Sequence, residues 1–475
     1  MAVSHWPLAR TVARAGQLGV VSGTGIDNVF VRRLQDHGVD GGLRAVLDRF
    51  PLQSVVDNVL SKFAKLRRTD ASTPYRVPPM MTHRNVQSSQ DLLVLAAYAE
   101  VAQAKSGHDG IVGINLLTKV QVPTVPTLFG AMLAGVDYVL MGAGIPVHIP
   151  GILDRLARGE SVDLPLDVEG EATKDQIPFL RFNPRRLLPQ WALHRPDFLG
   201  IVSSHVLATA LSRRSTGVVN GFVVESPIAG GHNAPPRGVM TVDEEGSPVY
   251  GERDRVDYDV MNGLGVPFWL AGGITSPVKV REALDVGATG VQVGTLFAYC
   301  RESGMESGLK QRVIDQVRSS SVHVTTSTRA SSTGYPFKVA NVEGTLSDPE
   351  VYEHRARICD LGYLREAFMK DDGSIAYRCA AEPLDAYARK GGELKDTSGR
   401  TCLCNALMAT AGFAQIRHKG YVEPPIVTSG DAINEIGPML IEHDHYGACD
   451  VIAYLEPGIR SDFLVPSDPS APSGV

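Results

Sequence analysis

Seven short apolar runs, separated by amphipathic or polar stretches, constrain the fold of this chain most strongly. The runs are rich in β-branched residues and have the length of buried strands. Stretches such as LARTVARAG and PVKVREALDVG, which lie around them, carry the apolar spacing of helices. A repeated strand-then-helix order is typical of a parallel sheet covered by helices. The seven runs occupy residues 18–23, 111–117, 136–144, 198–204, 221–226, 266–274 and 288–297.

This repeat favours a (β/α)8 TIM barrel over an open α/β sheet. Several runs end in Gly or Ser, where the ligand-facing loops of a barrel begin. RVPPM at 76–80 would supply an eighth strand only in a weak form, because prolines interrupt it. Two polar insertions, 151–197 and 233–258, break the repeat. Long loops on this face of a barrel are lids or substrate walls, or else solvated loops, and both interpretations stay open.

The alternation stops at about residue 320, which divides the chain into three parts. Residues 1–320 are predicted to form the barrel. Residues 321–456 are predicted to form a mixed, mostly helical accessory domain that contains most of the cysteines. The Pro- and Ser-rich tail, 457–475, is expected to be disordered.

The composition excludes several classes of function. The 475 residues carry a formal net charge of -6 and no basic stripe, which argues against a nucleic-acid surface. No apolar stretch is long enough to span a membrane, and the start MAVSHWPLAR lacks the features of a secretory signal. Six cysteines are too few for a disulfide scaffold in so long a chain. We therefore expect a cytoplasmic protein with no membrane contact.

Two glycine-containing turns predict a phosphate site. AGGI at 271–274 and QVGT at 292–295 each end a predicted strand. Glycines there expose backbone N–H groups, and a threonine hydroxyl adds a donor. Barrels commonly bind phosphate after their last two strands. Tight turns alone would also use glycines, but the pair at this spacing favours phosphate binding by Gly272, Gly273, Gly294 and Thr295.

A histidine behind a glycine pair is the candidate for proton transfer. His232 follows the run at 221–226, so in a barrel it would lie over the same mouth as the phosphate turns. Gly230 and Gly231 would let backbone and ligand approach closely. Histidine exchanges a proton near neutral pH, which at this position favours a catalytic role over a structural one.

Two further polar residues end otherwise apolar runs. Asn115 would face the barrel mouth, where its amide suits a planar heterocycle, although a turn-forming role is the alternative. Glu225 would be costly to bury unless its carboxylate meets water, a partner or a ligand.

Four of the six cysteines lie close together in the C-terminal part of the sequence. They are Cys359, Cys379, Cys402 and Cys404. Four thiolates suit Zn or an iron–sulfur cluster, but their spacing matches none of the usual paired CxxC signatures. Small buried apolar residues are the alternative and the preferred interpretation.

The motifs GINLL, VDYVLMGAGIP, ESPIAGGH, VPFWLAGGI and ATGVQVGTLFAYCRESG together resemble the nitronate monooxygenase (2-nitropropane dioxygenase) superfamily. That superfamily also contains FMN-dependent enoyl-(acyl carrier protein) reductases. The likeness covers roughly residues 5–305 and implies an FMN-binding TIM barrel with His232 as its catalytic residue. It also implies flavin contacts at Asn115, Glu225, Gly230, Gly273, Gln292, Gly294 and Thr295.

The resemblance leaves several activities open. The first is oxidation of an alkyl nitronate, or a similar small carbanionic substrate, by O2 through FMN. The second is an NAD(P)H-dependent enoyl or quinone reductase, for which an acyl carrier protein is a possible partner. A third, of another class, is a partner-binding protein that keeps flavin only as structure. A homodimer is compatible with all three.

The resemblance also predicts a strand before the first apolar run. Family members have a strand that ends in a Gly-Gly-Met-like turn ahead of the segment resembling HWPLARTVARAGQLGVVSG. This sequence starts at Met1, after the point where that strand ends. We expect either an earlier start of the protein or a different segment that closes the barrel.

Overall fold

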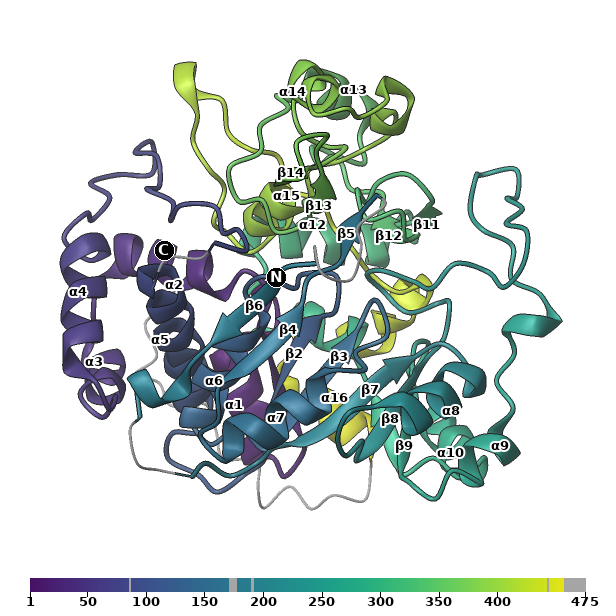
Figure 1. Cartoon of the computed structure of the whole chain (residues 1–475). Helices are drawn as coiled ribbons and strands as arrows, with labels where there is room; N and C mark the ends of the chain where they lie inside the picture. The colour runs from purple at the N-terminus through teal and green to yellow at the C-terminus, as the bar shows by residue number, and fades with distance from the viewer. Residues whose placement is uncertain (85–86, 171–176, 189–191, 442–443, 457–475) are drawn as a thin grey trace.

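A parallel sheet of seven strands forms the centre of the structure, a computed structural model that describes residues 1–84, 87–170, 177–188, 192–441 and 444–456 (Figure 1). All seven predicted runs form strands of this sheet, and all neighbouring strands are parallel. The segment 76–80 is not a strand. In spatial order the strands are β1 (Gly19–Ser22), β2 (Val112–Leu117), β3 (Tyr138–Gly142), β7 (Asp197–Val202), β8 (Gly221–Glu225), β9 (Phe268–Ala271) and β10 (Gly290–Gln292).

The sheet curls in the manner of a TIM barrel, as its interior side chains show. Leu140, Leu199, Val223 and Ala271 form one buried cluster, against which Val20 of β1 also packs. Side chains from distant strands meet inside because the sheet bends around them. The alternate residues point outward into a larger core shared with the helices.

The curled sheet is open between its two edge strands. No pairing joins β10 to β1 within the described part of the chain. A cavity of about 460 Å3 lies along this opening. Its wall includes Leu8 and Val12 from α1 (Trp6–Arg14) and Ile452 and Leu455 from α16 (Ala448–Leu455). The first strand inferred from the family resemblance stays a prediction.

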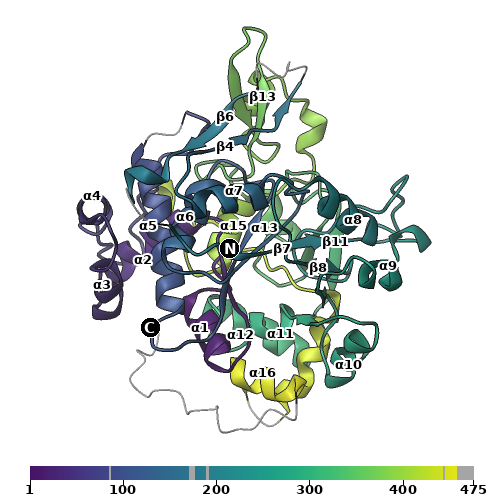
Figure 2. The same cartoon turned by 60° about the horizontal axis from the view of Figure 1, so that its bottom comes forward.

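Helices cover the outside of the sheet in the expected strand-then-helix order. Figures 1 and 2 show α1 and α16 together on one side of the molecule and α8 to α10 on another. The helices of this part are α1 (Trp6–Arg14), α2 (Ile26–His37), α3 (Gly41–Leu47), α4 (Gln53–Phe63), α5 (Gln87–Ala104), α6 (Thr124–Leu133), α7 (Ile149–Ala157), α8 (His205–Arg214), α9 (Tyr258–Asn262), α10 (Pro277–Asp285), α11 (Thr295–Ala298) and α12 (Ser307–Arg318).

The two insertions differ in structure. The first insertion, 151–197, contains an antiparallel pair of strands, β4 (Val162–Pro165) and β6 (Phe179–Phe182). It also contains the short strand β5 (Val168–Glu169) and a 3-10 turn, Pro184–Arg186. The second is a polar loop with one 3-10 turn, Glu252–Asp254. Because β5 pairs in parallel with β13 (Glu366–Met369) of the C-terminal region, the first insertion packs against that region, and its role as a lid or substrate wall stays a prediction.

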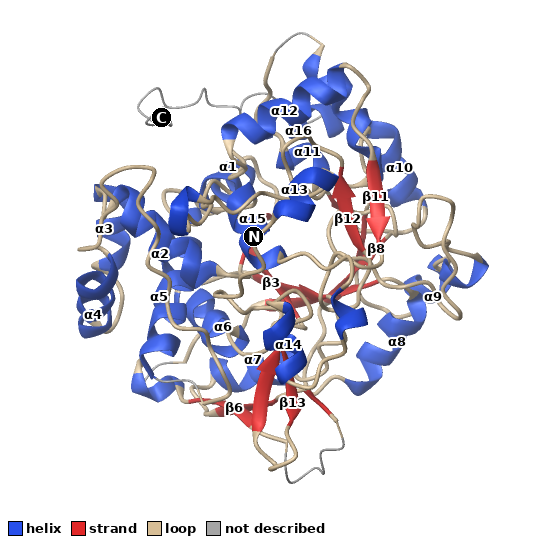
Figure 3. Cartoon of the chain, turned by 90° about the horizontal axis from the view of Figure 1, so that it is seen from above, coloured by secondary structure: helices blue, strands red, loops and turns tan. Residues whose placement is uncertain are grey.

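Most of the C-terminal region lies over the carboxyl ends of the sheet strands, whereas α16 lies beside the opening between β1 and β10 (Figures 1 and 3). It contains two antiparallel pairs, β11–β12 and β13–β14, among short helices. Its elements are β11 (Val324–Ser327), β12 (Phe337–Ala340), α13 (Pro349–His354), β13 (Glu366–Met369), β14 (Ile375–Arg378), α14 (Leu384–Arg389), η4 (Leu394–Thr397), α15 (Leu403–Thr410), η5 (His418–Gly420), η6 (Asp431–Leu440) and α16 (Ala448–Leu455).

One hydrophobic cluster joins this region to the barrel. Leu8 and Leu296 pack in it with Val427, Ile433 and Val451. Both parts of the chain therefore share a core, and the predicted division at residue 320 stays a prediction. The expected tail, 457–475, lies outside the described residues. None of the described helices is long and apolar enough to cross a membrane.

Candidate active site

His232 lies on the rim formed by the carboxyl ends of the strands, in the loop after β8. That loop pairs with the start of β12. The Lys338 N–H donates to the Gly231 carbonyl, and the Asn233 N–H donates to the Pro336 carbonyl, each at 2.9 Å. A segment about a hundred residues later in the chain therefore fixes the backbone on both sides of His232.

The imidazole of His232 starts a short relay of hydroxyl groups. Its Nε2 is 2.7 Å from Ser331 Oγ, which is 2.8 Å from Thr333 Oγ1. The ring also meets the edge of Phe337, with 4.8 Å between ring centroids. Nδ1 makes no hydrogen bond with the part of the chain that is described. Among the described residues it is therefore the unpaired nitrogen of the ring.

Burial decides the charge of this histidine. It lowers the pKa of His232 to about 4, and the nearby positive charge of the Met1 amino group lowers the pKa further. The imidazole is consequently neutral at pH 7. A neutral ring with Nε2–H donated to Ser331 presents a lone pair at Nδ1, which is the form that accepts a proton.

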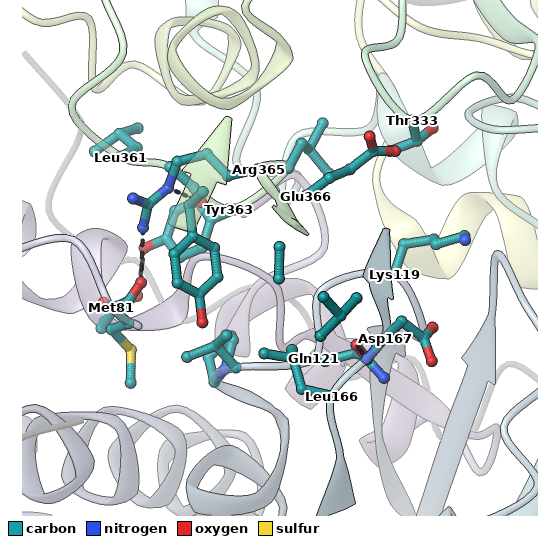
Figure 4. Close-up of a pocket in the computed structure, with 18 of the residues that line it drawn as sticks. Met81, Lys119, Gln121, Leu166, Asp167, Thr333, Leu361, Tyr363, Arg365 and Glu366 are labelled. Atoms are coloured by element: carbon teal, nitrogen blue, oxygen red, sulfur yellow. Dashed lines mark hydrogen bonds between the residues drawn. The ribbon is translucent and has the colours of Figure 1, made fainter. Parts of the chain in front are cut away.

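Thr333 connects the relay to a pocket of about 490 Å3 at the carboxyl ends of β1 and β2 (Figure 4). Two hydrogen bonds fix one wall of this pocket: the Tyr363 hydroxyl donates to Asp27 Oδ1 at 2.5 Å, and Arg365 donates to the Met81 carbonyl at 2.7 Å. Its lining also includes Lys119 and Gln121 after β2, Leu166 and Asp167 from the first insertion, and Tyr363 and Glu366 from the C-terminal region.

Charges of both signs face this pocket. Burial, and next the neighbouring charge of Glu169, raise the pKa of Glu366. The ammonium of Lys119 acts in the opposite direction on Glu366, and it lies 5.9 Å from the centre of the Tyr335 ring. The pocket is thus polar at one end and lined by apolar side chains elsewhere, as is typical of small-molecule sites.

The two predicted phosphate turns lie on neighbouring strands. Gly272 and Gly273 have φ values of 95° and 71°, a conformation that favours glycine. A Cβ on Gly273 would lie 2.5 Å from Ile228 Cδ1. At Gly294 a Cβ would meet no atom within 4 Å, so this turn faces open space.

A segment that sequence reasoning missed packs against these turns. The Gly430 N–H donates to Thr295 Oγ1 at 3.1 Å, and the Gly231 N–H donates to Thr428 Oγ1 at 2.9 Å. A Cβ on Gly230 would lie 2.8 Å from the Ser429 carbonyl carbon, so this glycine admits a chain segment. The only signal in the sequence was the TSGD turn ahead of η6.

The other predicted residues lie around the same rim but open to different cavities. Asn115, Gln292 and Gly294 line the cleft between β1 and β10. Glu225 lines a separate, more open cavity of about 920 Å3 together with Gly272 and Gly273. Within the described ranges, the side chains of Asn115, Glu225 and Gln292 have no hydrogen-bond partner. The side chains of these three residues, which lie on β2, β8 and β10, are therefore unpaired polar groups of the sheet.

Comparison with known proteins shows which family part of this chain resembles. Residues 186–344 match the nitronate monooxygenase family, and the match contains His232 and both glycine turns. This region is similar to the nitronate monooxygenase family. A curated relative, the probable nitronate monooxygenase of Bacillus subtilis (strain 168), is 30% identical over 117 residues, which are 25% of this chain and 31% of the relative. The aligned part is thus less than a third of that relative.

Solved structures similar to the whole chain were also found. They include FabK from Thermotoga maritima, with 14% identity, a TM-score of 0.45, and coverage of 96% of this chain and 88% of that one. Nitroalkane oxidase from Streptomyces ansochromogenes has 14% identity, a TM-score of 0.46, and coverage of 96% and 92%. Both TM-scores are below 0.5.

The residues of the nitronate monooxygenase region fit a flavin mononucleotide. The Gly294–Thr295 turn faces open space, and the Gly272–Gly273 turn, which packs against Ile228, lines an open cavity, so both turns offer backbone N–H groups to a phosphate. The unpaired groups of Asn115, Glu225 and Gln292 suit the polar edge of a heterocycle. Whether one flavin contacts all of them stays a prediction.

Glu225 gives this site a measurable dependence on pH. Burial raises its pKa from 4.5 to about 7. As pH rises from 4.5 to 7, the unfolded chain loses this proton while the folded chain retains it, so stability falls across that window. The free energy of unfolding of flavin-free protein should drop by up to about 3 kcal/mol from this group.

Urea unfolding of the wild type and of Glu225→Gln, at pH 5 and pH 8, measures this effect. The variant should lack this part of the decline, because glutamine does not titrate. Equal declines in both proteins would show that the carboxylate is solvated in the folded state.

Proposed function

We propose that the chain is an FMN-dependent oxidoreductase that oxidises alkyl nitronates, or similar small carbanionic substrates, with O2. The observation that carries the proposal is the neutral His232, with Nδ1 unpaired, on the same rim as the two glycine turns. The family match over residues 186–344 supports it. FMN, when bound, would supply the redox chemistry by taking an electron pair from the substrate and returning it to O2.

The residues of the chain would bind the cofactor, transfer a proton and attract the substrate. The glycine turns and Thr295 would bind the phosphate. His232 would accept the α-proton of a bound nitroalkane at Nδ1, which leaves the nitronate for oxidation, while Ser331 holds Nε2. Lys119, at the polar end of the pocket, would attract an anionic substrate.

The size of the pocket favours a second candidate, an NAD(P)H-dependent enoyl-(acyl carrier protein) or quinone reductase. A volume of about 490 Å3 exceeds the need of a small nitronate and suits a larger substrate. His232 would then have to donate a proton after hydride transfer, and the low pKa of its imidazolium makes it less suited to that role.

An anaerobic titration separates the two candidates. Purified protein should show a flavin spectrum that an alkyl nitronate bleaches and that air restores. Bleaching by NADH or NADPH, with no response to a nitronate, would establish the reductase instead. Flavin that none of these compounds reduces would favour a partner-binding protein.

The pH dependence of kcat/KM tests the state of His232. Because its pKa is about 4, the base should stay deprotonated and kcat/KM for a neutral nitroalkane should be level between about pH 8 and pH 5.5. Below that range activity should fall as the imidazole becomes charged. A limb with an apparent pKa near 6.5 would instead indicate a solvated histidine.

A further inference from the structure

The pocket of about 490 Å3 is lined by a buried carboxylate that forms no ion pair. Asp27 lies in the first turn of α2, after β1, and is 4% exposed. The Tyr363 hydroxyl donates to its Oδ1, but no lysine, arginine or histidine of the described ranges forms an ion pair with it. A carboxylate in this position is costly to bury unless a cation compensates its charge.

The next residue adds a hydrogen-bond acceptor that has no donor. Asn28 is 3% exposed and lines the same pocket. Its amide nitrogen donates to the Tyr363 hydroxyl at 2.6 Å, whereas its Oδ1 has no hydrogen-bond partner among the described residues. Buried polar atoms are rarely left unpaired. Asp27 and Asn28 therefore present acceptors to this pocket that the described chain does not satisfy.

Tyr363 holds both acceptors in place and has nothing more to give them. Its single hydroxyl proton goes to Asp27, and its oxygen accepts from Asn28. Tyr363 follows Asp27 by 336 residues, so the C-terminal region fixes the two side chains at the pocket.

The arginines around this part of the pocket do not neutralise Asp27. The guanidinium of Arg365 donates to the carbonyls of Gly362 and Met81. The charge of Arg32, which is fully buried in α2, lowers the pKa of Asp27, but burial has the larger effect and raises it above its usual value. The carboxylate therefore still lacks a compensating positive charge.

The other carboxylates of the lining are in a different situation. Asp167, Glu169 and Glu366 all reach solvent. Glu169 also pairs with Arg378 at 2.7 Å. Water and salt screen exposed charges. Asp27 is therefore the carboxylate of this lining that most needs a partner.

The opposite side of the pocket carries a cation and leads to the catalytic histidine. Figure 4 shows Lys119 and Thr333 across the pocket from Tyr363. Thr333 connects to His232 through Ser331. A molecule that spans the pocket would thus meet a positive charge near the histidine relay and unsatisfied acceptors at its other end.

We propose that the pocket takes a substrate with a protonated amine at the end remote from its reacting carbon, and that Asp27 and Asn28 bind this ammonium group. An ammonium has three donors and a positive charge, so it supplies both what Asp27 lacks and what Asn28 lacks. A volume of about 490 Å3 has room for such a bifunctional molecule. The inference rests on the proposed function for the nitro group that faces the relay, whereas the amine site itself does not depend on flavin.

Calorimetric titration of the purified full chain with two series of compounds tests the proposal. The first series consists of ω-aminoalkanoates with about four to eight carbon atoms, whose carboxylate replaces the nitronate near Lys119. The second consists of alkanoates that have a methyl group in place of the ammonium. We expect at least one aminoalkanoate to bind about tenfold or more tightly than its methyl counterpart.

Three variants assign this preference to residues. Asp27→Asn should abolish it, because the amide keeps the shape of the side chain but not its charge. Asn28→Ala should weaken binding of the amine by a smaller factor, since it removes only an uncharged acceptor. Glu169→Gln is the matched control: Glu169 lines the same pocket, but Arg378 already compensates its charge, so the preference should remain.

Two results would overturn the proposal. The first is that no aminoalkanoate binds more tightly than its alkanoate, including the case in which neither series binds. The second is a full preference in Asp27→Asn or, if that variant does not fold, in Asn28→Ala. Aminoalkanoate binding by a protein whose flavin no nitronate reduces would instead contradict the proposed oxidation and leave the amine site in place.

Discussion

His232→Ala should lower turnover by about 10²- to 10⁴-fold, the usual effect of removing a positioned acid or base. His232→Asn should lower it nearly as much, because asparagine keeps hydrogen bonding to Ser331 but cannot take a proton. Flavin content should remain, since the glycine turns lie on β9 and β10 and the histidine follows β8. Steady-state kinetics and the flavin absorbance of each variant give the result.

A histidine with only a structural role would behave differently. The alanine variant would then lose flavin or stability, because the contacts with Phe337 and Ser331 are gone, and flavin-loaded molecules would turn over at nearly the original rate. That outcome would falsify the catalytic assignment. His323→Ala provides the control, since His323 is exposed and pairs with Glu245 at a distance from this relay.

Gly273→Val should yield folded protein that purifies with little or no flavin. Its φ of 71° disfavours a branched side chain, and the added Cβ would collide with Ile228 at 2.5 Å. The turn must then shift, which removes the N–H groups from the phosphate position. Absorbance ratios of the purified protein, with circular dichroism to verify folding, measure the loss.

The control variant Gly265→Val separates the effect of backbone strain from the loss of the phosphate-binding turn. Gly265 has the same φ of 71°, and a Cβ there would meet no atom within 4 Å. This variant should suffer similar strain while keeping its flavin. Full flavin content in Gly273→Val would show that this turn does not bind the flavin phosphate.

The strands of the barrel could be predicted because their signal is local. Each run, such as GFVVE in β8, alternates between the interior cluster and the helix-facing core, and β-branched residues suit both positions. The glycine turns were recognisable for the same reason, since the conformations at Gly272 and Gly273 require glycine locally.

The surroundings of the site could not be predicted, because they depend on contacts between distant segments. Ser331 lies 99 residues after His232, and Gly430 lies 135 residues after Thr295. No local pattern encodes such pairs, so neither the relay nor the segment against the phosphate turns was anticipated. The sequence left open whether Cys359, Cys379, Cys402 and Cys404 come together for the same reason, since their spacing matches no usual ligand signature, and in the structure all four line one small cavity.

The opening between β10 and β1 has a consequence for how the protein behaves in a crowded solution. Unpaired strand edges are templates for association with other chains. Here β1 has four residues and β10 three, and α1 and α16 cover the cleft between them. A helix from the far end of the chain thus shields the backbone that a closing strand would otherwise protect. Resistance to aggregation, and not only the packing of the core, therefore depends on α16.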